Sequence, residues 1–326
     1  GDPPRMDAPA VLPRSLIRRM LDDVRRSMAE LRADLPALGR YLIEPEAHVY
    51  AFSIAANVLL SFFPFMLVMI AICRHLLDWP AAELSLYIAI RDYFPGSTGQ
   101  FLAYNLKVAA DNSRRLEWVS MLLLLFTANG IFLPLEVALN KAWGVKVNRS
   151  LLKNQAVSML LIFGCGFLVM LSAAVSGLGP VLWSGMSGQS LDAMRSTLTD
   201  RWQLNWAPMP LVGVLKLTTI PSTLLILFLV FWLLPNTKVP WRAIVPRAVV
   251  IGLFLEALKW VNLLIWPWVY AKFSREFGVF NNSVTILTWS LFAALVVLAG
   301  ADWTARSVRR SIEVEKEPGG GLAQSE

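Results

Sequence analysis

Charge is scarce in this sequence, and long stretches of the chain contain almost none. Only 16% of the 326 residues are charged, against about 25% in a soluble globular domain, and 56% are hydrophobic. The mean hydropathy is +0.53. Because the core of a bilayer is about 30 Å thick and takes roughly 20 apolar residues per helical crossing, this clustering excludes an ordinary soluble domain and indicates a membrane protein.

Cysteine and histidine are also scarce, with two residues of each. Cys73 and Cys165 fall at different depths of two apolar stretches, so no disulfide is expected between them. His48 and His75 lie at opposite ends of one stretch and cannot share a metal ion. The sequence also lacks the phosphate-binding glycine motifs, HExxH and GxSxG. We therefore expect no metal, no cofactor and no enzymatic activity.

Six apolar stretches are each long enough to cross a bilayer as a helix. They are too continuous for the ten-residue alternating strands of a membrane barrel, so we expect an all-α, polytopic membrane protein. The predicted spans are residues 49–73, 116–133, 155–177, 211–234, 244–266 and 281–301. The chain then divides into a basic N-terminal segment (1–48), a six-helix transmembrane domain (49–301) and a tail (302–326), part of which is expected to be disordered.

Basic residues alternate between the two sides of the predicted spans. Nineteen of the 30 Lys and Arg residues lie in the N-terminal segment, in the loops at 134–154 and 235–247, and in the tail. Nine lie in the alternate segments. Since Lys and Arg are enriched on the cytoplasmic side, we expect both ends of the chain in the cytoplasm. The net charge of +7 is then a topology signal and an attraction to anionic lipid, and we expect no nucleic-acid partner.

Segments outside the spans have the spacing of amphipathic helices. The outer loop at 74–115 predicts two short helices, around residues 84–91 and 101–108, and residues 178–210 predict similar structure. Residues 14–40 predict a helix that lies on the inner leaflet or packs on the cytoplasmic ends of the spans. Its predicted apolar stripe consists of Leu16, Met20, Val24, Met28, Leu31 and Leu35.

The first predicted span carries polar residues at intervals of four. Ser53, Asn57 and Ser61 share one helical face, and Pro64 follows one turn later. Proline removes a backbone hydrogen bond and kinks a helix. Such a stripe either lines a polar path through the membrane or forms hydrogen bonds between helices, which are common in membrane bundles.

The fifth predicted span contains two charges near mid-depth. Glu256 and Lys259 lie three residues apart on neighbouring positions of one face, with Asn262 about one turn further out. Charges at this depth are costly and usually face the protein interior or water. The pair is either a substrate or proton site, or a mutually neutralising pair that joins helices. We expect the polar stripe around Asn57 to face the same interior space, forming a path for a lipid headgroup.

Several short motifs, weak singly but specific as a set, occur in a fixed order between about residues 40 and 310. The set resembles the YihY/virulence factor BrkB family, formerly labelled ribonuclease BN. The matching positions are Leu60, Ser61 and Pro64 in the first span; Asn140, Trp143 and Val145 after the second; Pro235, Asn236 and Pro240 in the turn before the fifth; Glu256; and Trp289, Gly300, Ala301 and Asp302 in the last.

The resemblance implies a bacterial inner-membrane protein that supports envelope integrity and transports lipids or lipid precursors. It implies membrane lipids as partners, either phospholipids or lipopolysaccharide precursors. The residues do not support the former ribonuclease label, because RNA hydrolysis needs clustered metal ligands or an exposed acid–base pair. Two alternatives stay open: a small-solute channel or transporter, and a non-catalytic scaffold that binds envelope partners.

Overall fold

The computed structural model of the protein describes residues 14–79, 82–83, 86–87, 90, 94, 97–112, 114–145, 150–187, 219–237 and 239–316. Within these residues every regular element is a helix, as the all-α prediction requires. The elements are α1 (Arg14–Ile43), α2 (Pro45–Ala71), the π-helical turn η1 (Ile72–Leu76), α4 (Ser97–Asn112), α5 (Arg114–Trp143), α6 (Leu151–Ser187), α9 (Thr219–Leu233), α10 (Trp241–Phe277), the 3-10 turn η3 (Gly278–Phe280) and α11 (Asn281–Lys316).

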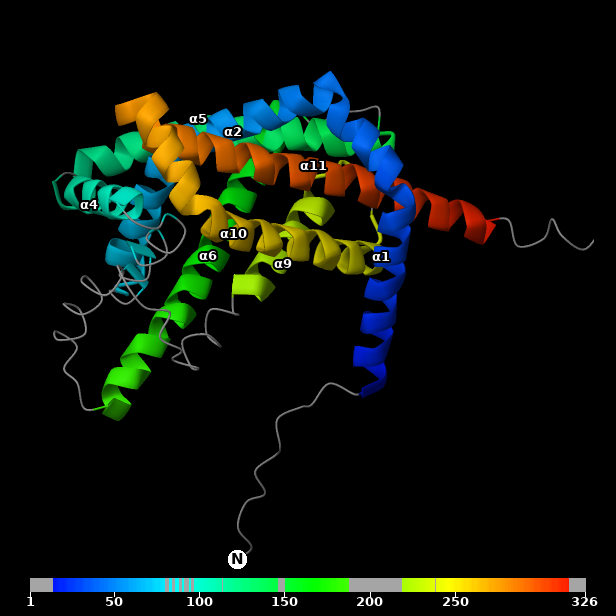
Figure 1. Ribbon diagram of the computed structural model, residues 1–326, viewed down its shortest axis with the longest axis horizontal. Helices are drawn as coiled ribbons and strands as arrows, with labels where there is room; N and C mark the ends of the chain where they lie inside the picture. The colour runs from blue at the N-terminus through cyan, green and yellow to red at the C-terminus, as the bar shows by residue number, and fades with distance from the viewer. Residues whose placement is uncertain are drawn as a thin grey trace, which may run out of the picture.

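Each predicted span coincides with a long helix: α2, α5, α6, α9, α10 and α11 (Figure 1). The part of the fourth predicted span at 211–218 lies outside the described residues. Among the described residues, three segments are long and apolar enough to cross a membrane, namely Pro45–Leu76, Leu152–Ser172 and Leu264–Arg310. A shorter apolar segment, Ile220–Leu233, forms most of α9. The count of six crossings stays a prediction.

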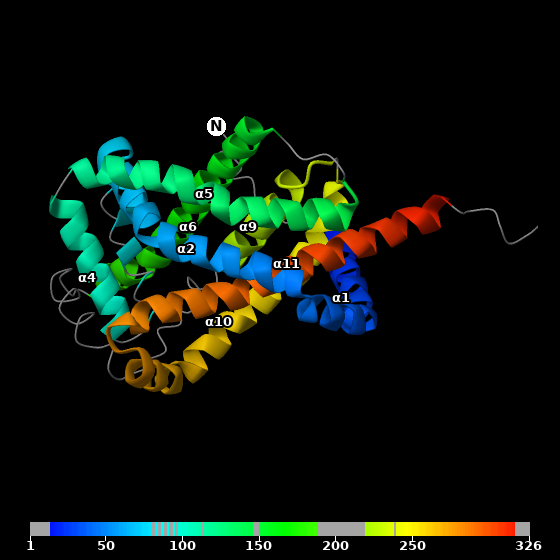
Figure 2. The same cartoon turned by 90° about the horizontal axis from the view of Figure 1, so that it is seen from above.

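The six long helices pack in a closed order. α2 packs on α5, α5 on α6, α6 on α9, α9 on α10, α10 on α11, and α11 returns to α2. α11 also packs on α5, so the ring is bridged by a contact between these two helices. Seen from above, α5, α2 and α11 run side by side, whereas α6 is inclined to them in both views (Figure 2).

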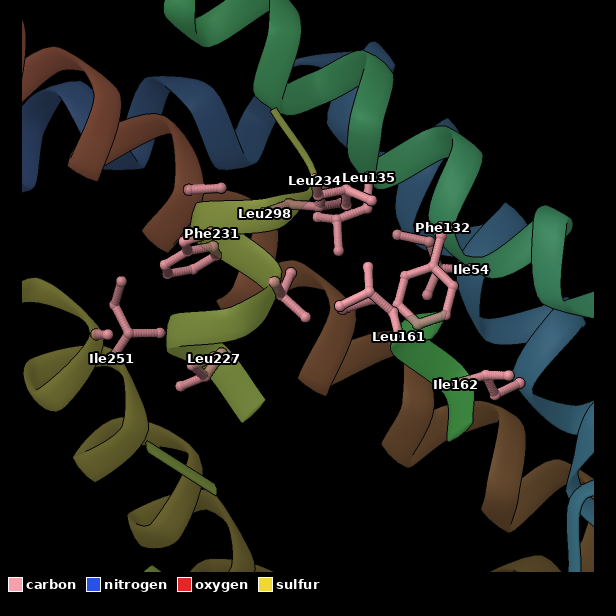
Figure 3. Close-up of a cluster of buried hydrophobic side chains, with 14 of the residues drawn as sticks. Ile54, Phe132, Leu135, Leu161, Ile162, Leu227, Phe231, Leu234, Ile251 and Leu298 are labelled. Atoms are coloured by element: carbon pink, nitrogen blue, oxygen red, sulfur yellow. The ribbon is translucent and has the colours of Figure 1, made fainter. Parts of the chain in front are cut away.

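Buried apolar side chains fill the space between these helices. Because lipid tails are as apolar as these side chains, close packing rather than exclusion from water holds the helices together. Figure 3 shows the group, which we call the central apolar cluster and which draws on all six helices. Its labelled members are Ile54, Phe132, Leu135, Leu161, Ile162, Leu227, Phe231, Leu234, Ile251 and Leu298.

α1 stands across the ends of α10 and α11 and packs on both (Figure 1). The predicted helix is therefore present, and its observed neighbours are the ends of the spans. The face turned to the bundle includes buried Ser27, Asp34 and Leu38, whereas Met28 and Leu35 of the predicted stripe are exposed. Val24 and Leu31 of the stripe do pack on the apolar core, and the side chains of Leu16 and Met20 lie outside the described part of the structure. The acidic side chains Glu30 and Asp34 bind arginines of the bundle, so this face is partly polar.

The segment that follows α2 packs on the bundle as well. α4 confirms the second helix predicted for the outer loop, and described residues 82–83 and 86–87 are also helical. Leu86 and Leu106 are buried in the apolar core, so these pieces cover the end of the bundle. Arg74 binds Glu83 at 2.5 Å and Asp111 at 2.9 Å, which joins the three pieces.

Candidate functional site in the transmembrane bundle

An ion pair within α10 is the centre of the candidate site. Lys259 Nζ lies 2.6 Å from Glu256 Oε2. Glu256 is buried, with 7% of its surface exposed, whereas the side chain of Lys259 is 29% exposed. Because both residues belong to one helix and are three positions apart, the pair forms without fixing the position of any other helix.

A threonine on the neighbouring helix completes the site. Thr223 of α9 donates its hydroxyl hydrogen to Glu256 Oε1 at 2.8 Å, so both oxygens of the carboxylate are engaged. α9 and α10 approach closely just beside it, where Gly252 contacts Leu224 and leaves no space for a Cβ. Sequence reasoning missed Thr223, whose one signal was a hydroxyl inside a strongly apolar run.

Large apolar side chains are exposed on the helix that carries the ion pair. They include Phe254, Trp260 and Leu264 of α10. Lys259 is next to Trp260 in sequence and only partly exposed, whereas Glu256 is buried. The pair therefore extends from the buried side of α10 toward its exposed apolar residues.

Several polar atoms in the neighbouring part of α10 and α11 are buried and have no hydrogen-bond partner among the described residues. On α11 they are Asn281 Oδ1, Thr285 Oγ1 and Trp289 Nε1, which lie at intervals of four and share one face. On α10 the atom is Asn262 Oδ1. An unpaired buried polar group costs about 1–3 kcal/mol, so the partners of this set are water or groups outside the described residues.

The register of the two helices follows from one close contact. A Cβ added to Gly300 of α11 would lie 2.6 Å from Ile251 Cδ1 of α10, so these residues are level. Since the helices are antiparallel, eleven residues from this contact along each helix lead to Asn262 on α10 and to Trp289 on α11. The unpaired polar atoms of both helices therefore lie on the part of the α10–α11 pair that is nearer to η3.

The polar stripe of α2 forms its observed contacts within α2 and with α5. Asn57 donates a hydrogen bond to the carbonyl of Ser53 at 2.8 Å, and Ser61 is buried and bonds a carbonyl of its own helix. Asn57 also contacts Gly130 of α5 so closely that a Cβ there would overlap its amide. Pro64 is buried within α2. The observed neighbours of the stripe are thus on α2 and α5, and its common path with Glu256 stays a prediction.

Two of the family motifs meet at the end of α5. The backbone N–H of Asn236, in the turn after α9, donates to Asn140 Oδ1 at 2.8 Å. Asn140 is buried and in turn donates to Glu136 Oε1 at 3.5 Å. Pro235 is buried in the same turn, and Pro240 ends it as the residue before α10. The motif therefore fixes the turn between α9 and α10 to the end of α5.

The other motif residues have separate neighbours. Trp143 is half-buried and packs on the apolar core. Asp302 binds Arg306 of its own helix, with 2.5 Å between Oδ2 and Nη2. Tyr41 lies outside the predicted spans. Burial of its hydroxyl, and to a lesser degree the negative charge of Asp302, raise the pKa of this hydroxyl above its ordinary value. Trp143 therefore belongs to the packing at the end of α5, whereas Asp302 of α11 lies near Tyr41 at the end of α1.

A second group of charges joins three helices, and we call it the α1 clasp: Glu30, Asp34, Arg247, Ser307 and Arg310. Arg247 of α10 is buried and places Nη2 2.9 Å from Glu30 Oε2 and 2.8 Å from Ser307 Oγ of α11. Arg310 of α11 forms an ion pair with Asp34. From the sequence, Arg247 and Arg310 counted only as topology signals, and their partners are too distant in the chain to be inferred.

These features define an integral membrane protein of the all-α, polytopic class. The sequence matches the virulence factor BrkB family over residues 42–321, and the chain belongs to that family. Curated relatives named UPF0761 membrane protein include one from Laribacter hongkongensis, 28% identical over 66% of this chain and 47% of the relative. A second relative, from Chromobacterium violaceum, is 27% identical over 65% of this chain and 46% of the relative. A third, from Yersinia enterocolitica, is 26% identical over 69% of this chain and 72% of the relative.

The chain spans about half the length of the first two curated relatives it matches. No solved structure matches it. The family expected from the motifs is therefore confirmed, whereas the activity has to be argued from the site.

Proposed function

We propose that the protein moves lipids or lipid precursors between the leaflets of the membrane and thereby supports the integrity of the bacterial envelope. The observation that carries the proposal is the ion pair between buried Glu256 and partly exposed Lys259, beside the exposed apolar residues of α10. A headgroup at this position can bind charged and polar groups while its acyl tails stay among the exposed apolar side chains of α10. Charged residues at membrane depth typically mark such substrate pathways.

Two features favour lipid over a dissolved solute. The central apolar cluster receives side chains from all six helices, which is unfavourable for a hydrated pore through the middle of the ring. The ion pair lies instead beside exposed apolar residues of α10, which is the arrangement that a lipid with its tails outside the bundle needs. A scaffold does not need a buried carboxylate in the membrane, because apolar residues of similar volume pack helices as well or better.

The proposal is tested with purified protein reconstituted into vesicles that contain a fluorescent phospholipid. A quencher added outside reports how fast label leaves the inner leaflet. We expect the wild-type protein to accelerate this movement, and the double substitution Glu256→Ala/Lys259→Ala to abolish the acceleration while the protein stays helical. Wild-type protein that moves no lipid with or without a gradient would leave the scaffold alternative as the better account.

We further propose that the protein resides in the bacterial inner membrane with both ends in the cytoplasm. The support is the distribution of Lys and Arg, which places 19 of 30 on the side of the two ends. A reporter enzyme that is active only outside the cytoplasm should be active when fused within residues 74–115 or 178–210. Activity of a fusion at residue 320 would contradict this orientation.

A further inference from the structure

The charges of the α10 site balance to zero, and this restricts the headgroups that it can take. Lys259 and Glu256 neutralise one another at 2.6 Å, and Thr223 adds a neutral hydroxyl. A headgroup that enters must replace part of this pairing in a region where an uncompensated charge is strongly unfavourable. The site therefore favours a headgroup that itself carries one charge of each sign.

We infer that the substrate is a zwitterionic phospholipid whose headgroup joins a phosphate to a primary ammonium, the phosphoethanolamine class. This inference rests on the proposed lipid movement. Lys259 binds the phosphate and Glu256 binds the ammonium, so each charge of the headgroup exchanges partners with one charge of the protein. The total stays at zero throughout, whereas an anionic phosphoglycerol headgroup would leave one negative charge in excess.

The geometry of the pair suits this exchange. Side chains three residues apart on a helix have Cβ atoms about 5–6 Å from one another. In phosphoethanolamine two carbon atoms separate the oxygen of the phosphate ester from the ammonium nitrogen, so one headgroup can reach both side chains. Because the ion pair joins two residues of α10, its opening by side-chain rotation does not require the bond between Thr223 of α9 and Glu256 to break. The bond from Thr223 holds the second oxygen of Glu256 while the first changes partner.

Neutral polar groups continue the site toward the outer end of α10 and α11. Asn262 lies about one turn beyond Lys259 on α10, and Trp289, Thr285 and Asn281 lie on the part of α11 that is nearer to η3. All four carry a buried polar atom without a partner among the described residues. The indole N–H of Trp289 and the hydroxyl of Thr285 can donate to phosphate oxygens, and the amide oxygens of Asn262 and Asn281 can accept from an ammonium. None of these groups adds net charge, so the balance at the ion pair is preserved along this row.

The test compares two lipids with identical labelled tails, one with a phosphoethanolamine and one with a phosphoglycerol headgroup, in vesicles containing the full chain. We expect the phosphoethanolamine lipid to move about tenfold faster or more. Movement of the phosphoglycerol lipid at an equal or greater rate overturns the inference but leaves lipid transport standing. If neither lipid moves, the proposed function itself is contradicted.

A single substitution should reverse the preference. Glu256→Gln keeps the shape of the side chain and leaves the charge of Lys259 uncompensated, so the anionic lipid should become the faster substrate. The matched control is Glu276→Gln, the same change at an exposed position near the outer end of α10, which should keep the wild-type preference. Thr223→Val should slow both lipids without changing their order. A Glu256→Gln protein that folds and keeps the wild-type preference overturns the inference. If this variant does not fold, the inference is judged by the ratio of the two lipid transport rates in the wild-type protein.

A further experiment tests whether the transported compound is the whole lipid or its free headgroup. Vesicles containing the protein are incubated with labelled, water-soluble phosphoethanolamine. We expect no uptake, because the ion pair adjoins exposed apolar side chains and the ring interior is apolar. Uptake of the soluble compound without movement of the lipid overturns the inference and favours a small-solute transporter.

Discussion

The α1 clasp and the Glu256–Lys259 pair are both charged groups in a mostly apolar protein, yet they are built differently. In the clasp, each ion pair joins two helices: Glu30 of α1 with Arg247 of α10, and Asp34 of α1 with Arg310 of α11. The mid-depth pair joins two residues of the same helix. The clasp therefore joins helices through its ion pairs, whereas the Glu256–Lys259 ion pair lies within α10 and is tied to α9 by the neutral hydrogen bond from Thr223.

This difference separates a structural role from a functional one. Opening the clasp strands the buried guanidinium of Arg247 and releases α1, so it should open rarely. Opening the pair in α10 needs only side-chain rotation, provided that another charge of each sign is at hand to replace what is lost. We therefore expect charged pairs between helices to contribute mainly to stability, and charged pairs within one helix to be available for function.

The largest effect is expected from Glu30→Ala, which removes the acidic partner of a buried arginine. Because Arg247 is then left without a counter-charge, the free energy of unfolding in detergent micelles should fall by about 3–5 kcal/mol. Thermal unfolding followed by circular dichroism measures the change. Asp23→Ala, the removal of an exposed carboxylate from the same helix, is the control and should change stability little. Equal effects of the two substitutions would show that the clasp contributes no stability.

The next effect concerns the pair in α10 taken one residue at a time. Glu256→Ala alone leaves Lys259 uncompensated at membrane depth and should cost about 2.5–3.5 kcal/mol of stability. The double substitution Glu256→Ala/Lys259→Ala should be less harmful than the single one, since no charge is stranded. Thermal unfolding followed by circular dichroism measures the stability of both variants. Identical stabilities for the single and double variants would mean that the two residues are not coupled.

A smaller effect is expected from Asn140→Ala at the motif that joins α5 to the turn before α10. The substitution leaves the backbone N–H of Asn236 without its acceptor and should cost about 1–3 kcal/mol. Asn105→Ala in α4 is the matched control, because that amide bonds a carbonyl of its own helix on the exposed surface. Protease cleavage in the 234–240 turn should increase for the first variant and not for the second.

The smallest effect should come from Gly130→Ala, which tests the close contact of α2 and α5. The added methyl group overlaps the amide of Asn57, so we expect a loss of about 1–2 kcal/mol. Gly164→Ala in α6 meets nothing within 4 Å and should be neutral or slightly stabilising. In the double variant Gly130→Ala/Asn57→Ala the loss should shrink. If it does not, Asn57 is not what limits the approach of the two helices.

The sequence predicts the helices well, because a bilayer imposes a length and a polarity that any span must meet. It also predicts that Glu256 and Lys259 can touch, since spacing along one helix fixes that distance. It does not predict Thr223 as a partner or Arg247 as part of a clasp, because those contacts depend on how helices far apart in the chain are rotated and paired. Asn57 shows the same limit: its helical face was predictable, and its contact with Gly130 was not.

The connections at both ends of the α10–α11 pair restrict how these two helices can move. The two helices are joined by η3 at one end and tied to the same helix, α1, at the other. Between these ends Gly300 lets them approach side by side at Ile251. Motions that slide one of these helices along the other are therefore restrained at both ends, whereas bending is still possible at Pro246 and Pro267 within α10. In a cycle that parts the central apolar cluster, the motion to look for is a joint change of tilt of α10 and α11 against α5 and α6.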